Sequence, residues 1–126
     1  MKWFDDSRFG HMMHWGAYSV LGEGEWVMNT NQIPKSDYIT EACAPFNPDK
    51  YSPDEWAYII QSTGQKYLTI TTKHHDGFAM FDTNVTEFAP YDVENTAAIH
   101  QSVLRPLATA CRERGIIFCC YYSLLD

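Results

Sequence analysis

Three short runs of polar and aromatic residues carry most of the chemistry that this sequence offers. They are residues 14–16 (HWG), 74–77 (HHDG) and 121–123 (YYS). Histidine, aspartate, tyrosine and serine side chains donate or accept hydrogen bonds. Indole and phenol rings add flat apolar surfaces, on which a sugar ring can stack. Together these residue types predict a binding site for a polar ligand.

A metal site is the main alternative for the same runs, because His11, His14, His74, His75 and Asp76 include the commonest zinc ligands. Side chains an odd number of positions apart on a strand point to opposite faces of the sheet. If His11 and His14 lie on one strand, they cannot share an ion without a bulge. Strand geometry therefore argues against a metal site, and no metal ligand is assigned.

Two acidic residues are candidates for the catalytic pair of a retaining glycosidase, which uses two carboxyl groups about 5 to 5.5 Å apart. Glu25 and Asp76 are the best-placed acids in the sequence. Asp76 directly precedes Gly77, a pair typical of turns, so its carboxylate is interpreted as a turn cap. No Gly-x-Ser-x-Gly motif is present to indicate a serine nucleophile.

Buried strands are expected to position the three runs. Each run follows or closes a stretch rich in apolar and β-branched residues, and these stretches predict strands near 9–15, 66–73 and 116–122. Ligand sites of parallel α/β proteins lie at the carboxyl ends of the strands. The three runs are therefore expected to face one crevice.

Helical signals lie between these strands. Ser52, Pro53 and Glu55 form an N-cap, a first-turn proline and a capping-box acid, and so predict a helix over 53–63. Apolar residues at three- and four-residue spacing predict a second helix over 97–114, with a kink or two abutting helices at Pro106. Residues 17–52, rich in glycine and proline, are predicted to form a long loop with one short helical turn.

The order strand, helix, strand, helix, strand predicts an α/β fold with a parallel sheet. No linker or repeat divides the chain, so residues 1–126 are interpreted as one domain. A complete (β/α)8 barrel needs about 250 residues. The length therefore permits one core and excludes a full barrel.

Charge and cysteine content narrow the class of protein further. The chain has 9 basic and 16 acidic residues, a formal charge of -7, and no basic cluster, which disfavours nucleic acid and membrane surfaces as partners. The four cysteines show no Cys-x-x-Cys spacing, and the start of the chain lacks the apolar run of a signal peptide. These features favour reduced thiols and a cytoplasmic protein.

Several of these segments resemble one known family. Residues 9–19 (FGHMMHWGAYS), the Glu25-Trp26 pair, residues 67–78 (YLTITTKHHDGF) and residues 121–123 are similar to stretches of the α-L-fucosidases, a family of glycoside hydrolases. The similarity extends over nearly the whole chain, and the KHHDGF run is its most specific part.

The resemblance implies that the chain is the N-terminal portion, about three strands, of an incomplete (β/α)8 barrel. It also implies retaining hydrolysis of terminal α-L-fucosyl linkages in glycans, without a cofactor. The positions that match the fucose pocket of the family are His14, Glu25, Trp26, His74, His75 and Tyr121. The family's nucleophile is an aspartate on the next strand and its acid/base a glutamate further on, so both are expected beyond residue 126. We thus expect no catalytic residue in this chain, which should be inactive alone.

Two other interpretations stay open from the sequence. The chain could be a non-catalytic fucose-binding protein or a remnant of a truncated gene, and a metal-dependent hydrolase is a third alternative. A three-stranded parallel sheet on its own would also expose its edges and apolar faces. We therefore expect the isolated chain to be unstable or to associate into oligomers.

Overall fold

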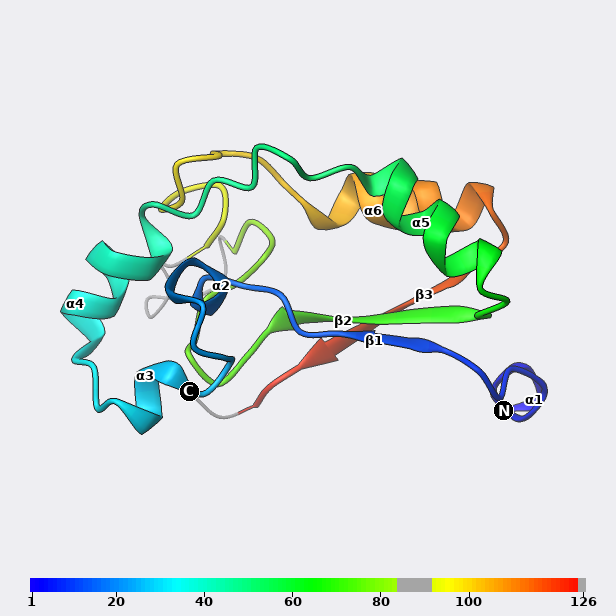
Figure 1. Cartoon of the computed structure of the whole chain (residues 1–126), viewed down its shortest axis with the longest axis horizontal. Coiled ribbons are helices and arrows are strands. Elements are labelled where there is room, and N and C mark those ends of the chain that lie inside the picture. Colours follow the sequence, from blue (N-terminus) through cyan, green and yellow to red (C-terminus); the bar gives the residue numbers. More distant parts are fainter. Residues whose placement is uncertain (84–91, 125–126) are drawn as a thin grey trace.

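A three-stranded parallel sheet forms the centre of the computed structural model, which describes residues 1–83 and 92–124. The strands are β1 (His11–Met13), β2 (Tyr67–Lys73) and β3 (Ile117–Tyr122). They lie side by side in the order β1-β2-β3, with β2 in the middle (Figure 1). The predicted α/β fold with a parallel sheet is therefore confirmed. The first strand is shorter than the range 9–15 predicted for it.

Helix α5 (Pro53–Ser62) connects β1 to β2 on one face of the sheet. The Ser52 hydroxyl accepts a hydrogen bond from the Glu55 amide, and Pro53 occupies the first helical position, where its missing N–H costs nothing. The chain leaves the helix through Gly64, whose φ of 80° suits a residue without a Cβ. This is the helix that the sequence predicts over 53–63.

Helix α6 (Leu104–Glu113) connects β2 to β3 and lies next to α5 on the same face (Figure 1). The predicted start at residue 97 is wrong, because residues 97–103 form turns and bends. The predicted kink or pair of abutting helices at Pro106 is also wrong, because one helix runs from Leu104 to Glu113. Pro106 is the third residue of the helix, where a proline lacks only an N–H that has no intrahelical acceptor.

The segment between β1 and α5 is more ordered than the predicted loop over 17–52. It contains four short helices at the carboxyl end of the sheet: α2 (Tyr18–Leu21), α3 (Val27–Thr30), α4 (Lys35–Tyr38) and the π-helix η1 (Ile39–Cys43). Glycine and proline composition indicated a loop, but buried side chains such as Tyr38 and Cys43 hold these turns in place. Tertiary burial thus overrides weak local propensity here. Another short helix, α1 (Lys2–Asp6), precedes β1.

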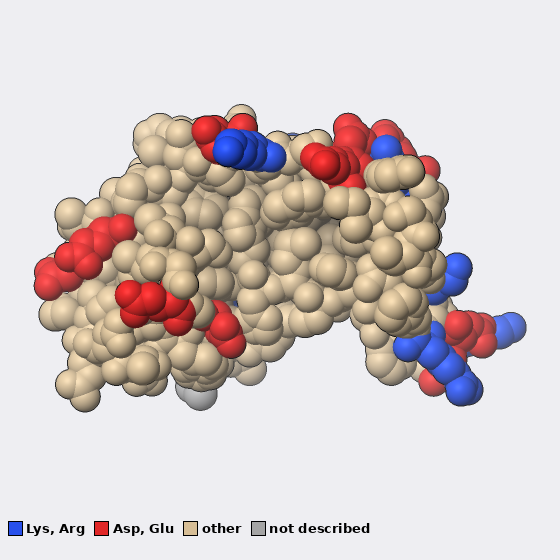
Figure 2. All heavy atoms as spheres, viewed as in Figure 1, with Lys and Arg blue, Asp and Glu red and all other residues tan. Residues whose placement is uncertain are grey.

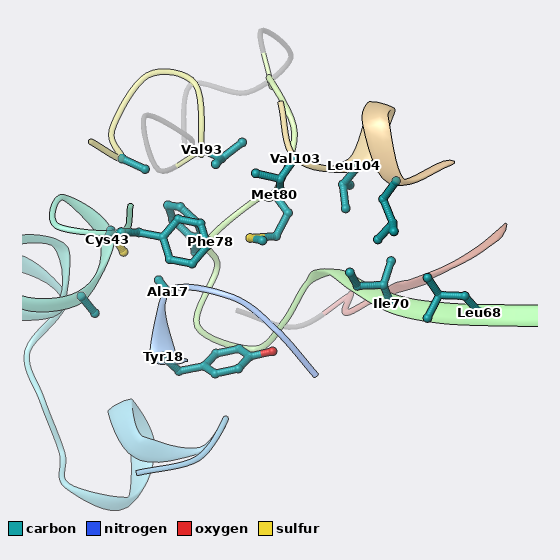
Figure 3. Close-up of a cluster of buried hydrophobic side chains, with 14 of the residues drawn as sticks. Ala17, Tyr18, Cys43, Leu68, Ile70, Phe78, Met80, Val93, Val103 and Leu104 are labelled. Carbon is teal, nitrogen blue, oxygen red and sulfur yellow. The ribbon is translucent and has the colours of Figure 1, made fainter. Parts of the chain in front are cut away.

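The hydrophobic core lies between the sheet and the helices. Leu68 and Ile70 point from β2 toward Leu104 at the start of α6, and Phe78 and Met80 fill the space beside them (Figure 3). Leu68 and Ile70 are the apolar side chains of β2 on this face, and both are fully buried. Packing on that face leaves the opposite face and the carboxyl end of the strands for polar groups.

Candidate functional site

The carboxyl end of the sheet gathers three aromatic side chains from three different segments. The ring centroid of His74 lies 5.3 Å from that of His14 and 5.9 Å from that of Tyr121. The ring centroids of His14 and Tyr121 are 6.3 Å apart. The structure therefore brings one residue from each of the three predicted runs together, around His74.

Backbone hydrogen bonds to Thr71 place His14 in this cluster. The buried Thr71 hydroxyl accepts from the Trp15 amide and donates to the Trp15 carbonyl, each at 3.0 Å. The Tyr18 hydroxyl lies 3.0 Å from the same oxygen. Because the single Thr71 proton goes to Trp15, Tyr18 acts as donor. The Thr71 side chain on β2 thus holds both the amide and the carbonyl of Trp15, the residue directly after His14.

Trp26 and His75 form a stacked pair at the edge of the cluster. Their ring centroids are 4.7 Å apart with an interplanar angle of 23°. Trp26 is 48% exposed, so much of the indole surface faces solvent. A hollow of about 190 Å³ lies beside the pair, and it is lined by Glu25, Trp26, Met28, Asn29, Ile33, His75 and Asp76. All six predicted pocket residues thus lie in the ring cluster or along this hollow.

His74 is the most buried of the predicted residues, with 4% of its surface exposed. Its Nδ1 atom is buried and has no hydrogen-bond partner within the described part of the chain. Burial lowers the pKa of His74 below 6.5, and the neighbouring His75 and His14 lower it further. The ring is therefore neutral at pH 7, with one nitrogen able to donate and the other to accept.

Both carboxylate oxygens of Asp76 accept hydrogen bonds from other parts of the chain. Its Oδ1 accepts a hydrogen bond from the Phe78 amide at 3.2 Å, which caps the turn as predicted. Its Oδ2 accepts from the Tyr38 hydroxyl at 2.6 Å. Burial raises the pKa of the Asp76 carboxyl above its usual value of 3.8. Although Glu25 lines the same hollow, this bonding makes Asp76 a poor partner for it in catalysis.

His11 lies apart from the cluster. Its Nδ1 is 3.2 Å from the Gln65 Oε1, near the amino end of β2, and it pairs in register with Leu68. His14 follows the end of β1 instead of lying on it. Among residues 1–83 and 92–124, no group of three or more His, Cys, Asp or Glu side chains could hold a metal ion.

Two polar residues next to the cluster have partners that the sequence did not predict. Lys73 and Ser123 are both buried, and the Lys73 ammonium donates to the Ser123 carbonyl at 3.1 Å. The Ser123 hydroxyl lies 2.7 Å from Nδ1 of His75. A lysine immediately before two histidines at the end of a buried strand was the available signal, because buried lysines usually have a specific partner.

On the face shown in Figure 2, Lys and Arg side chains form no continuous stripe. No helix in the described part of the chain is both long and apolar enough to span a bilayer.

Known proteins that are similar in sequence to this chain are named α-L-fucosidases. The sequence profile of the α-L-fucosidases matches residues 1–126. The tissue α-L-fucosidase of Macaca fascicularis is 34% identical over 142 aligned residues, which cover 99% of this chain and 29% of that protein. The chain thus spans less than a third of this curated relative.

Solved structures show the same similarity. The α-L-fucosidase isoenzyme 1 of Paenibacillus thiaminolyticus is 39% identical with a TM-score of 0.91, and the match covers 99% of this chain and 28% of that one. The α-L-fucosidase AlfC of Lactobacillus casei, in complex with its α-L-fucose product, is 35% identical with a TM-score of 0.90; this match covers 99% and 40%, respectively. The chain described here therefore belongs to the α-L-fucosidase family.

Proposed function

We propose that this chain is the sugar-recognising part of an α-L-fucosidase, an enzyme that removes terminal α-linked L-fucose from glycans with retention of configuration. One observation carries the proposal. In a chain of this family, a buried neutral His74 packs against both His14 and Tyr121, and its Nδ1 has no hydrogen-bond partner among the described residues. A buried polar atom without a partner costs free energy, which a ligand hydroxyl would recover.

Each predicted pocket residue then has a chemical role. The imidazoles of His14, His74 and His75, with the Tyr121 hydroxyl and the Glu25 carboxylate, hydrogen-bond sugar hydroxyls. The exposed face of Trp26 provides apolar contact. Such groups orient the ring, and their hydrogen bonds strengthen as the ring flattens toward an oxocarbenium-like transition state.

The catalytic carboxyl groups are expected outside this chain. Asp76 is already hydrogen-bonded to Tyr38 and Phe78, and the family resemblance assigns the nucleophile and the acid/base to later strands. We therefore propose that the chain binds fucose but does not hydrolyse fucosides alone. A longer protein that contains it would carry the activity.

The arrangement of helices supports the proposal that the sheet is the first part of a (β/α)8 barrel. Both α5 and α6 lie on the same face of the sheet (Figure 1). Right-handed crossovers that all run in one direction keep their helices on one face of the sheet, as a barrel requires. The exposed side chains of Ile117 on β3 and Leu124 after it are surfaces that further strands would cover.

L-fucose titration of the chain, followed by NMR chemical shifts, tests the binding proposal. We expect saturable shifts around His74 with L-fucose and none with the enantiomer D-fucose. His74→Ala should abolish binding, whereas His11→Ala, which changes a histidine outside the cluster, should preserve it. Equal responses to both enantiomers would overturn the proposal.

Turnover of 4-nitrophenyl α-L-fucoside separates the enzyme from a non-catalytic fucose-binding protein. The second function is considered because the chain covers so little of its curated relatives. We expect turnover by a longer protein that includes this chain and none by the chain alone. Fucose binding without turnover in the longer protein would favour the binding function.

A further inference from the structure

We propose that Ser123, held in place by Lys73, is a positioning residue that fixes the orientation of His75 toward the sugar. This inference rests on the proposed function for its purpose, although its geometry stands without it. The Ser123 hydroxyl lies 2.7 Å from Nδ1 of His75, and Ser123 is 3% exposed. The bond joins the end of β3 to the turn that follows β2.

Stacking and hydrogen bonding constrain different motions of the His75 ring. The Trp26 indole, with its centroid 4.7 Å away and nearly parallel, fixes the plane of the imidazole. It does not distinguish the two orientations that a half-turn of χ2 exchanges, because this torsion is roughly two-fold in histidine. The Ser123 hydroxyl makes the distinction, since only a ring nitrogen, and not a ring carbon, forms this bond.

Lys73 in turn holds the backbone of Ser123. The Lys73 ammonium donates to the Ser123 carbonyl at 3.1 Å, and the Ser123 amide donates to the Lys73 carbonyl at 2.9 Å. These two bonds follow a register shift between Thr71 and Lys73, where the regular pairing of β2 with β3 ends. The Lys73 side chain thus takes the place of regular backbone hydrogen bonds between β2 and β3, at the point where β3 reaches the candidate site.

The cost of burying an ammonium supports a specific role for Lys73. Only 8% of Lys73 is exposed, and its Nζ also lies 5.1 Å from the centroid of the Tyr122 ring. A buried charge is expensive unless it is hydrogen-bonded or lies against an aromatic face. Lysine here supplies a charge-assisted bond that an apolar side chain of similar length could not make.

Two NMR readouts test the inference on a longer protein that contains this chain. Side-chain ¹⁵N shifts of His75 report the tautomer and the hydrogen bonding of each ring nitrogen. L-fucose titration reports affinity. In Ser123→Ala we expect the two nitrogen shifts to move toward each other. We also expect the affinity for L-fucose to fall about twofold, because without the bond about half of the rings would lie in the wrong orientation.

Three further variants sharpen the test. Lys73→Met should move the His75 nitrogen shifts in the same direction as Ser123→Ala, and Ser123→Thr, which keeps the hydroxyl, should restore them. Thr72→Val is the matched control, because the buried Thr72 hydroxyl also joins β2 to β3, through the Tyr121 carbonyl at 2.9 Å. It should leave the His75 nitrogen shifts unchanged.

The possible outcomes separate this inference from the proposed function. Unchanged His75 shifts in Ser123→Ala would overturn the inference. Unchanged affinity in that variant, with wild-type binding intact, would also overturn it. If the wild-type protein failed to bind L-fucose while the Ser123→Ala shifts moved as expected, the proposed function would fail and the positioning contact would stand.

Discussion

The two ends of β2 differ in what they bury. At the carboxyl end, Thr71, Lys73 and His74 are buried polar residues, and the hydroxyl and the ammonium are hydrogen-bonded. At the amino end, Tyr67 is half-buried and contacts the rings of Trp3 and Phe4 in α1, which are 37% and 56% exposed. Polar groups are thus buried at one end, and apolar groups are left exposed at the other.

The two histidines of the first strand region show that position along the strand, and not residue type, decides what a side chain contacts. His11 and His14 are three residues apart, yet one contacts Gln65 near the amino end and the other contacts His74 at the carboxyl end. Residue type is the same, and only the place relative to the strand ends differs. The fold therefore gathers the candidate binding residues at one end, because parallel strands bring all their carboxyl ends to one edge.

The largest expected effect comes from breaking the carboxyl end at Thr71. Thr71→Val keeps the side-chain shape but leaves the Trp15 amide and carbonyl and the Tyr18 hydroxyl without this partner. Buried unsatisfied groups are costly, so we expect the free energy of unfolding to fall by about 3 kcal/mol in urea denaturation. Thr69→Val, half-buried on the same strand, should cost less than about 0.5 kcal/mol. Equal losses in both variants would contradict this interpretation.

A second variant removes a bond that ties α4 to the turn after β2. Tyr38→Phe deletes the hydroxyl that donates to Asp76 at 2.6 Å. Hydrogen bonds to charged groups contribute more than neutral ones, so we expect a loss of about 2 kcal/mol in the free energy of unfolding. Tyr58→Phe, at a tyrosine that is 60% exposed on α5, is the control and should be neutral. A neutral Tyr38→Phe would show that the bond is not stabilising.

The histidine cluster should respond to pH in a defined direction. Since burial and neighbouring histidines lower the pKa of His74, the unfolded chain binds this proton more readily than the folded one. The contribution of His74 to stability is therefore present above pH 6.5 and is lost as the pH falls through its folded pKa. His14→Gln removes one cause and should raise the His74 midpoint in an NMR titration. His11→Gln should not change it, and equal shifts in both variants would contradict the assignment.

The smallest effect is expected at the amino end. Trp3→Ala removes an edge-to-face contact with Tyr67, whose ring centroid is 6.3 Å away. A partly exposed contact of this kind is worth about 1 kcal/mol or less in the free energy of unfolding. We also expect unchanged affinity for L-fucose, measured by the same titration as above. Weakened fucose binding would show that the two ends are coupled.

Much of the framework could be predicted from the sequence. The capping residues Ser52 and Pro53 marked the start of α5, and the β-branched run before Lys73 marked β2. The family assignment is also confirmed. The start of α6 could not be predicted, because apolar spacing continues into residues 97–103, which pack as turns. The fucose-binding roles of the six pocket residues stay a prediction.

Local patterns by themselves determined the order of strands and helices, the polar runs at the strand ends and the family, because these depend on residue type and on spacing of a few positions. Only the tertiary structure decided how the runs are held. Thr71 holds the chain beside His14 across 56 residues, and Ser123 reaches His75 across 48. Contacts at such separations leave no periodic signal in the sequence, since they arise only when the sheet aligns distant segments.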